Sequence, residues 1–149
     1  MSTKIQFEEQ ILIPARTVSE VFDYVSDFSR AAEWRSEVVE SSMSPPAPIQ
    51  VGARLHEVSR IVGRQVVTDS VVDGLSGPTF WSFAHASGPL PVGGDYRLQE
   101  EGKGVRLTYR LEVRLTGVWA LGTPYLRWSG RRIMRRSLDR LAERVVRPA

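Results

Sequence analysis

The sequence predicts an α+β domain in which a curved seven-stranded antiparallel sheet wraps a long C-terminal helix. Residues 121–146 show a helical apolar period, and residues 53–115 show short alternating segments separated by short turns. Short turns favour antiparallel neighbours. With 149 residues, of which 42% are hydrophobic, the chain has the size of one domain, so we expect a single domain over residues 1–149.

The last helix is expected from about Leu121 to Val146 and carries one apolar stripe. At 100° per residue, small and apolar positions fall within one arc and charged positions fall opposite. The stripe consists of Leu126, Gly130, Ile133, Met134, Ser137, Leu138, Leu141 and Val145. Because it covers more than a third of the circumference, it suits packing on a sheet better than a coiled-coil seam.

The first elements of the chain are a strand and two short helices. Apolar and polar residues alternate from Lys4 to Ile13, which indicates a strand with one covered face, and Pro14 ends it. The segment from Thr17 to Glu20 forms a capping box and begins a short helix. A second short helix is predicted from Phe28 to Trp34, begun by Ser29. These elements precede the main part of the sheet.

The remaining strands follow without another helix. We predict them over residues 36–43, 54–62, 65–73, 79–86, 95–100 and 105–115. The last is the clearest, because apolar residues alternate strictly with polar ones from Val105 to Leu115. The loop Gly88–Gly94 is either a lid over an entrance or a plain connection.

Several chemistries are excluded by composition and spacing. The chain has no cysteine, which rules out disulfides and thiolate metal sites and fits a reducing compartment. His56 and His85 lack the spacing of metal-binding motifs, and no phosphate-binding or dinucleotide fingerprint occurs. No signal-peptide run or membrane-spanning stretch is evident. We therefore expect a cytoplasmic protein with no metal and no cofactor.

Positive charge is concentrated at the C-terminal end. Residues 127–149 hold eight of the twenty basic residues and two of the seventeen acidic residues. Such an end can meet an anionic membrane or a nucleic acid. The favoured interpretation is a solvated helix face whose arginines pair with Asp139 and Glu143. We expect no nucleic-acid partner, and membrane contact is disfavoured because the helix's apolar face is needed inside.

Four polar side chains are candidates for the pocket. Three of them lie on strand positions that should face the core, and the fourth lies on the long helix. Tyr109 lies between Leu107 and Leu111 on the covered face, as a core aromatic or a ligand contact. His85 alternates in phase with Trp81 and Phe83, so its side chain is expected to face inward. It is either a structural histidine or a group that carries protons. Glu9, on the covered face of the first strand, is either paired with an arginine or exposed at the strand's bend, or it is a general base. Arg127, at the edge of the helical stripe, either reaches out to water or lines a pocket mouth.

The candidate ligand contacts combine these residues with neighbouring apolar and small positions. They are Trp81, Phe83, His85, Tyr109, Arg127, Gly130 and Met134, and the candidate catalytic residues are His85, Tyr109 and Glu9. Gly130 and Ser137 indicate either space for a ligand or close contact with a strand. Tryptophans that offer planar surfaces are Trp34, Trp81, Trp119 and Trp128.

The order of elements resembles the helix-grip superfamily known as SRPBCC or START-like, and within it the polyketide cyclase/dehydrase branch. The matching residues are Ile11-Leu12-Ile13-Pro14-Ala15, Val21-Phe22-Asp23-Tyr24-Val25-Ser26-Asp27, Glu33-Trp34, Val51-Gly52, and Gly117 through the closing helix. The resemblance covers nearly the whole chain and implies a deep, mostly apolar pocket between the long helix and the sheet. It brings no catalytic motif, because the superfamily contains both carriers and enzymes.

Three functions are therefore expected, in descending order of support. The first is binding or transport of a hydrophobic small molecule, such as a lipid, in the internal cavity. The second is a cyclase or dehydratase acting on a polyketide-type or aromatic substrate, in which His85, Tyr109 or Glu9 moves protons. The third is a lipid or quinone handler at a membrane surface, which would use the arginine-rich helix.

Overall fold

The structure of the protein, a computed structural model, describes residues 2–61 and 63–146 and has the predicted architecture. Its elements are β1 (Ser2–Pro14), α1 (Val18–Val25), η1 (Phe28–Arg30), α2 (Ala31–Trp34), β2 (Val38–Ser44), β3 (Arg54–Ile61), β4 (Arg64–Ser76), β5 (Phe80–Ser87), β6 (Val92–Glu101), β7 (Gly104–Thr116), α3 (Val118–Leu121) and α4 (Thr123–Val146). The helix-grip fold is thus confirmed.

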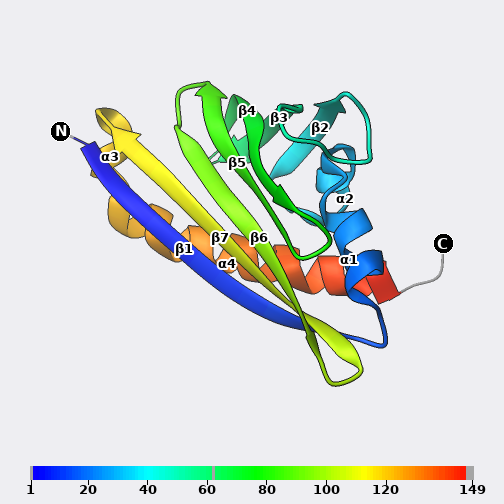
Figure 1. Cartoon of the computed structure of the whole chain (residues 1–149). Helices are drawn as coiled ribbons and strands as arrows, with labels where there is room; N and C mark the ends of the chain where they lie inside the picture. Colours follow the sequence, from blue (N-terminus) through cyan, green and yellow to red (C-terminus); the bar gives the residue numbers. More distant parts are fainter. Residues whose placement is uncertain (1, 62, 147–149) are drawn as a thin grey trace.

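The sheet is a single curved layer that holds α4 against one face (Figure 1). Its seven strands have the order β1-β7-β6-β5-β4-β3-β2, with every neighbouring pair antiparallel. The first strand therefore pairs with the last, and α4 packs closely on β1. In Figure 1, α1 and α2 lie at one end of the molecule, whereas α3 and the start of α4 lie at the other.

The predicted capping box begins α1. The Thr17 hydroxyl accepts a hydrogen bond from the Glu20 amide (3.2 Å), and the Glu20 carboxylate accepts one from the Thr17 amide (3.1 Å). The prediction that Ser29 begins the second short helix is wrong. Asp27 is the cap, because its carboxylate accepts from the Ser29 amide at 3.2 Å, and a 3₁₀ turn precedes α2.

The long helix is interrupted once, near its beginning. The predicted continuous helix from Leu121 is instead α3 followed by α4, with Gly122 between them. Pro124 has no amide hydrogen, and its ring would clash with the Ala120 carbonyl in an unbroken helix. That carbonyl accepts a hydrogen bond from the Thr123 hydroxyl at 2.7 Å instead. The break leaves the apolar stripe of α4 intact.

The core lies between α4 and the concave face of the sheet. The middle of the stripe is almost fully buried at Met134, Leu138 and Leu141. The predicted loop 88–94 is shorter than expected, because β6 begins at Val92 and pairs with β7 there. Leu90 within this loop is buried, so the connection packs on the core.

Candidate functional site

Three aromatic rings from neighbouring strands form a stack on the inner face of the sheet. The register pairs Trp81 of β5 with Tyr96 of β6, and Tyr96 with Tyr109 of β7. Their ring centroids are 4.6 Å and 4.5 Å apart, and the planes are nearly parallel. Trp34, at the end of α2, meets Tyr96 and Tyr109 edge-on at 6.2 Å. All four side chains are buried and form a rigid aromatic wall.

A buried arginine lies beside this wall. Arg35 follows Trp34 in the chain and is only 6% exposed. Its guanidinium donates to both carboxylate oxygens of Glu57 on β3, at 2.8 Å and 3.3 Å, and lies 3.6 Å from Glu37. The Ser59 hydroxyl donates to Glu57 at 2.5 Å. Burial is tolerated because the positive charge has a two-pronged partner.

Four buried polar atoms in this region have no hydrogen-bond partner among the described residues. They are Arg35 Nε, Glu37 Oε1, Trp81 Nε1 and Tyr109 Oη. Buried polar groups in proteins are nearly always paired, and each unpaired one costs free energy. The set comprises three donors, Arg35 Nε, Trp81 Nε1 and Tyr109 Oη, and one acceptor, Glu37 Oε1, that have no partner in the part of the chain that the structure describes.

Protonation makes the tyrosines of this site hydrogen-bond donors. Burial raises the pKa of Tyr109 above its usual value, although the Arg35 charge acts in the opposite direction. Burial, followed by the nearby Tyr109, raises the pKa of Tyr96. The two hydroxyls influence one another, but Tyr109 Oη does not meet Tyr96 in hydrogen-bonding geometry. Both phenols therefore keep their protons at neutral pH.

Arg35 keeps its charge for a different reason. Burial alone would lower its pKa, but the Glu57 carboxylate raises it well above the usual value. Tyr109 and Tyr96 are also close enough to influence this pKa. The aromatic wall and the Arg35 group with Glu37 and Glu57 thus form one site, which we call the Arg35 cluster.

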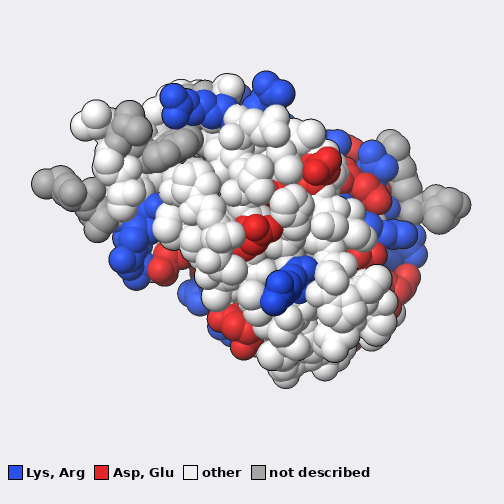
Figure 2. All heavy atoms as spheres, turned by 90° about the horizontal axis from the view of Figure 1, so that it is seen from above, with Lys and Arg blue, Asp and Glu red and all other residues white. Residues whose placement is uncertain are grey.

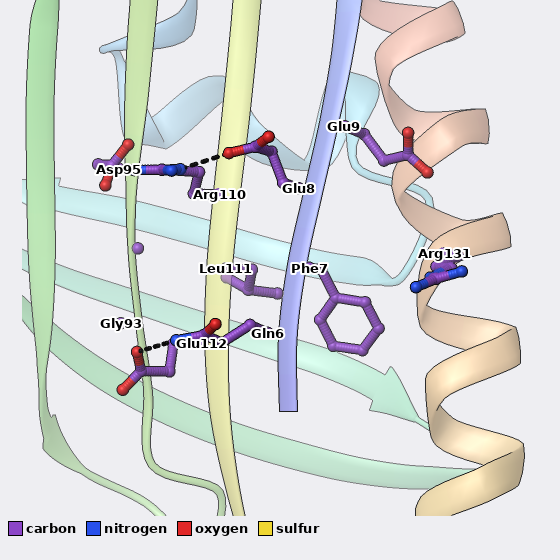
Figure 3. Close-up of a pocket in the computed structure, with 11 residues that line it drawn as sticks. Gln6, Phe7, Glu8, Glu9, Gly93, Asp95, Arg110, Leu111, Glu112 and Arg131 are labelled. Carbon is purple, nitrogen blue, oxygen red and sulfur yellow. Dashed lines mark hydrogen bonds and ion pairs between the residues drawn. The ribbon is translucent and has the colours of Figure 1, made fainter. Parts of the chain in front are cut away.

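The structure separates the predicted catalytic candidates. Glu9 is the cross-strand partner of Tyr109, is half-buried, and points toward α4 (Figure 3). His85 lies further along β5, opposite Ser70, and its Nε2 is 3.1 Å from the Gly88 carbonyl oxygen. Glu9 and Tyr109 are therefore neighbours, whereas His85 is tied to the turn that follows β5.

The small residues of α4 make close contacts with the protein itself. A side chain at Gly130 would begin 2.6 Å from the Phe7 ring, so that ring already occupies the space. The Ser137 hydroxyl accepts a hydrogen bond from the Ser36 amide at 3.1 Å. Of the two alternatives for these positions, close contact is the one that the structure shows.

The other predicted ligand contacts divide into buried and exposed groups. Met134 and Phe83 are buried, as is Trp81 in the aromatic wall. Arg127 is exposed, and its place at a pocket mouth stays a prediction. Trp128 is also exposed, whereas the side chain of Trp119 lies outside the described residues.

An open surface hollow of about 780 Å³ crosses β1, β7 and β6 beside α4 (Figure 3). Paired polar side chains dominate its lining: Arg110 donates to Glu8 at 2.5 Å, and the Gln6 amide donates to Glu112 at 3.3 Å. Among the predicted site residues, Glu9 lines this hollow. Because most of its lining side chains are charged or polar, the hollow resembles ordinary solvated surface more than an apolar pocket.

Arg35 and Glu57 were missed by sequence reasoning, although a signal was present. Glu57 has the same parity as Leu55 on β3, so it faces inward with that buried residue. An inward carboxylate requires a positive partner. Arg35, directly after Trp34, is the nearby basic residue that meets this requirement.

Comparisons with known proteins agree with the fold. A family model described as "Polyketide cyclase / dehydrase and lipid transport" matches residues 4–146. No curated protein matches the sequence. A solved structure of a protein from Thermus thermophilus is similar with a TM-score of 0.82 at 19% identity, covering 95% of this chain and 97% of that one.

Two further solved structures have names that describe their class. A START superfamily protein from Mycobacterium smegmatis has a TM-score of 0.75 at 15% identity, covering 94% of this chain and 96% of that one. The Zhui aromatase/cyclase from Streptomyces sp. R1128 has a TM-score of 0.73 at 11% identity, covering 96% and 94%. At these identities the likeness concerns the fold alone.

Proposed function

This chain belongs to the polyketide cyclase/dehydrase and lipid transport family, and from that premise we propose that it binds or carries a hydrophobic small molecule between the sheet and α4. The observation that carries the proposal is the set of unpartnered polar atoms at the Arg35 cluster. A bound molecule that supplies the missing hydrogen bonds would remove the cost of burying them. The cysteine-free composition supports a cytoplasmic setting.

The chemistry of the site favours a mostly apolar ligand with a neutral polar group. The stacked rings of the aromatic wall make the interior around the unpartnered polar atoms apolar, which favours a ring system or a folded hydrocarbon chain. Arg35 is already held by two carboxylates, Glu37 and Glu57, so the charged groups together are negative. A neutral hydroxyl or carbonyl oxygen is able to accept a hydrogen bond from Tyr109 Oη, whereas the net negative charge of these groups would repel a carboxylate.

A second candidate is a cyclase- or dehydratase-like activity. The observation that favours it is the position of Arg35 and Tyr109, which are two hydrogen-bond donors in a buried site. Donors of this kind stabilise a carbonyl oxygen that gains negative charge while an enolate forms. Glu9, across from Tyr109 in the register, would then be the group that accepts a proton.

The first experiment identifies what the protein carries. Protein purified from its own host is analysed by native mass spectrometry, and the bound compound is extracted and identified. We expect a compound of low polarity with a hydroxyl or carbonyl group. A protein that is repeatedly isolated empty, and that binds none of a panel of such compounds, would contradict the proposal.

The second experiment tests the site and separates the two candidates. Tyr109→Phe removes one hydrogen bond and should weaken binding by roughly 2- to 13-fold, the range that one such bond contributes. Tyr125→Phe is the matched control, because Tyr125 is exposed on α4. Equal affinities of the two variants would refute the assignment. A carrier returns the compound unchanged, whereas an enzyme converts it and loses rate in Tyr109→Phe while binding is largely retained.

A further inference from the structure

The beginning of the long helix presents large apolar side chains to solvent. Leu121 is 84% exposed, Tyr125 54% and Trp128 56%. At 100° per residue, Tyr125, Trp128 and Arg132 fall within an arc of about 60°, on the side of α4 opposite the buried stripe. We call Leu121, Tyr125, Trp128 and Arg132 the outer patch. Several large apolar side chains exposed at one end of the helix are typical of an interaction site.

Contacts within the outer patch order its side chains. The rings of Tyr125 and Trp128 lie 6.1 Å apart, and the Arg132 guanidinium lies 4.9 Å from the centre of the Trp128 ring. A guanidinium over an indole ring holds both groups in place. The patch therefore combines apolar surface with a fixed positive charge.

Further positive charges lie along the same part of α4. Its exposed arginines are Arg127, Arg131, Arg135 and Arg136, of which Arg136 falls next to the outer patch on the helix, while Arg135 donates to the Gln10 carbonyl at 2.7 Å. Within residues 2–61 and 63–146, no ion pair involves them or Arg132. The predicted pairs with Asp139 and Glu143 do not form among those residues either. By comparison, the face seen in Figure 2 carries charges of both signs scattered among uncharged residues.

We propose that the outer patch docks the protein on the surface of an anionic phospholipid bilayer. Tryptophan and tyrosine favour the interface between headgroups and acyl chains, and exposed arginines are attracted to anionic headgroups. No helix within the described part of the chain has the length and apolarity needed to cross a bilayer, so the contact is a peripheral one.

The earlier objection to membrane contact does not apply to this surface. The inward stripe is used internally, since Met134, Leu138 and Leu141 are buried. Tyr125, Trp128 and Arg132 lie on the opposite side of α4, and they and Leu121 of α3 are exposed without any opening of the fold. A second copy of the chain fits less well, because a two-fold contact would bring the same arginines together. Leu121 offers an aliphatic surface that suits acyl chains better than nucleic-acid bases.

The test uses vesicles and requires no knowledge of the internal ligand, so its result is independent of the proposed function. Phosphatidylcholine vesicles with and without phosphatidylglycerol are sedimented with the protein. We expect binding to the anionic vesicles alone, weakening as salt is added. Replacing Arg132 with glutamine should weaken binding about fivefold at low salt. Absence of binding to anionic vesicles would overturn the proposal.

A matched pair of variants assigns the binding to the outer patch. The first replaces the three apolar members, Leu121, Tyr125 and Trp128, with serine. The second replaces three exposed valines outside the outer patch with serine, namely Val39, Val51 and Val67. The affinity of the first variant for anionic vesicles should fall at least tenfold, whereas the second should bind as the unchanged protein does. Both variants should keep the circular dichroism spectrum and melting temperature of the unchanged protein. Equal losses would refute the assignment.

Two other outcomes would replace the bilayer with another partner. If ultracentrifugation shows a dimer that the first variant converts to a monomer, and vesicles do not compete with dimer formation, the outer patch is a contact between copies. If a single-stranded oligonucleotide displaces the protein from vesicles and binds more tightly, the partner is a nucleic acid. Either result overturns the proposal.

Discussion

Replacing Glu57 tests whether the loss of its ion pair with Arg35 costs as much stability as the loss of a buried ion pair should. Glu57→Gln preserves the shape of the side chain and removes its charge. Arg35 is 6% exposed and keeps only Glu37, at 3.6 Å, as a charged partner. The variant therefore creates no cavity but leaves a guanidinium poorly compensated in a medium of low polarity.

The size of the effect follows from this geometry. Removing one partner of a buried ion pair costs about 3–5 kcal/mol, and the remaining Glu37 places Glu57→Gln at the lower end of that range. For a domain of this length, about 3 kcal/mol lowers the melting temperature by roughly 6–12 °C. The double variant Arg35→Met/Glu57→Gln should lose less than the two single losses added together, because the arginine no longer needs a partner.

Thermal and urea unfolding, followed by circular dichroism, measure these losses. The control is Glu101→Gln, which breaks an equally two-pronged pair with Arg106 at the surface. Solvent screens that pair, so its loss should change the unfolding midpoint far less. If Glu57→Gln and Glu101→Gln lowered the midpoint equally, the reasoning about the Arg35 cluster would be wrong.

Three further predictions concern packing, titration and helix capping. Gly130→Ala should destabilise the protein by about 1–3 kcal/mol in a urea titration, because its Cβ would lie 2.6 Å from the Phe7 ring; Phe7→Leu added to it should recover part of the loss. Burial, followed by the hydrogen bond to Glu33, raises the pKa of Tyr24 from 10.0 to about 12. The protonated Tyr24 therefore stabilises the folded state fully below pH 10, and this contribution is lost as pH rises through 12. The free energy of unfolding of Tyr24→Phe, measured across this range, should lack the part of the decline that Tyr24 causes. Thr17→Ala should cost about 1 kcal/mol in thermal unfolding, whereas Thr17→Ser should not, because serine keeps the capping hydroxyl.

Much of the fold was predictable because its signals are local. Alternation of side chains defines the covered face of a strand, and the period of α4 defines its buried stripe. Hydrogen-bonding side chains beside a helix start, such as Thr17 and Glu20, act within one turn. The errors at Ser29 and at residue 122 also have local causes, since Asp27 competes as a cap and Pro124 prevents an unbroken helix.

The candidate site was predictable only in part. The alternation of side chains along each strand showed that Trp81 and Tyr109 face inward. It does not show which rings face one another across strands. The stack depends on the pairing of β5, β6 and β7, and the position of Arg35 depends on how α2 packs against them. The sequence leaves two alternatives for Gly130, because only the packing of β1 against α4 places Phe7, far away in the sequence, against it.

By itself, the sequence determined the order of the elements, the face that each one buries and the family to which the chain belongs, because these follow from periodicities and short motifs. Tertiary structure alone decided that an arginine next to Trp34 shares a buried site with a glutamate on β3, and that the aromatic start of α4 faces outward. Both depend on distances between segments remote in the chain, which the packing of the whole sheet around α4 sets.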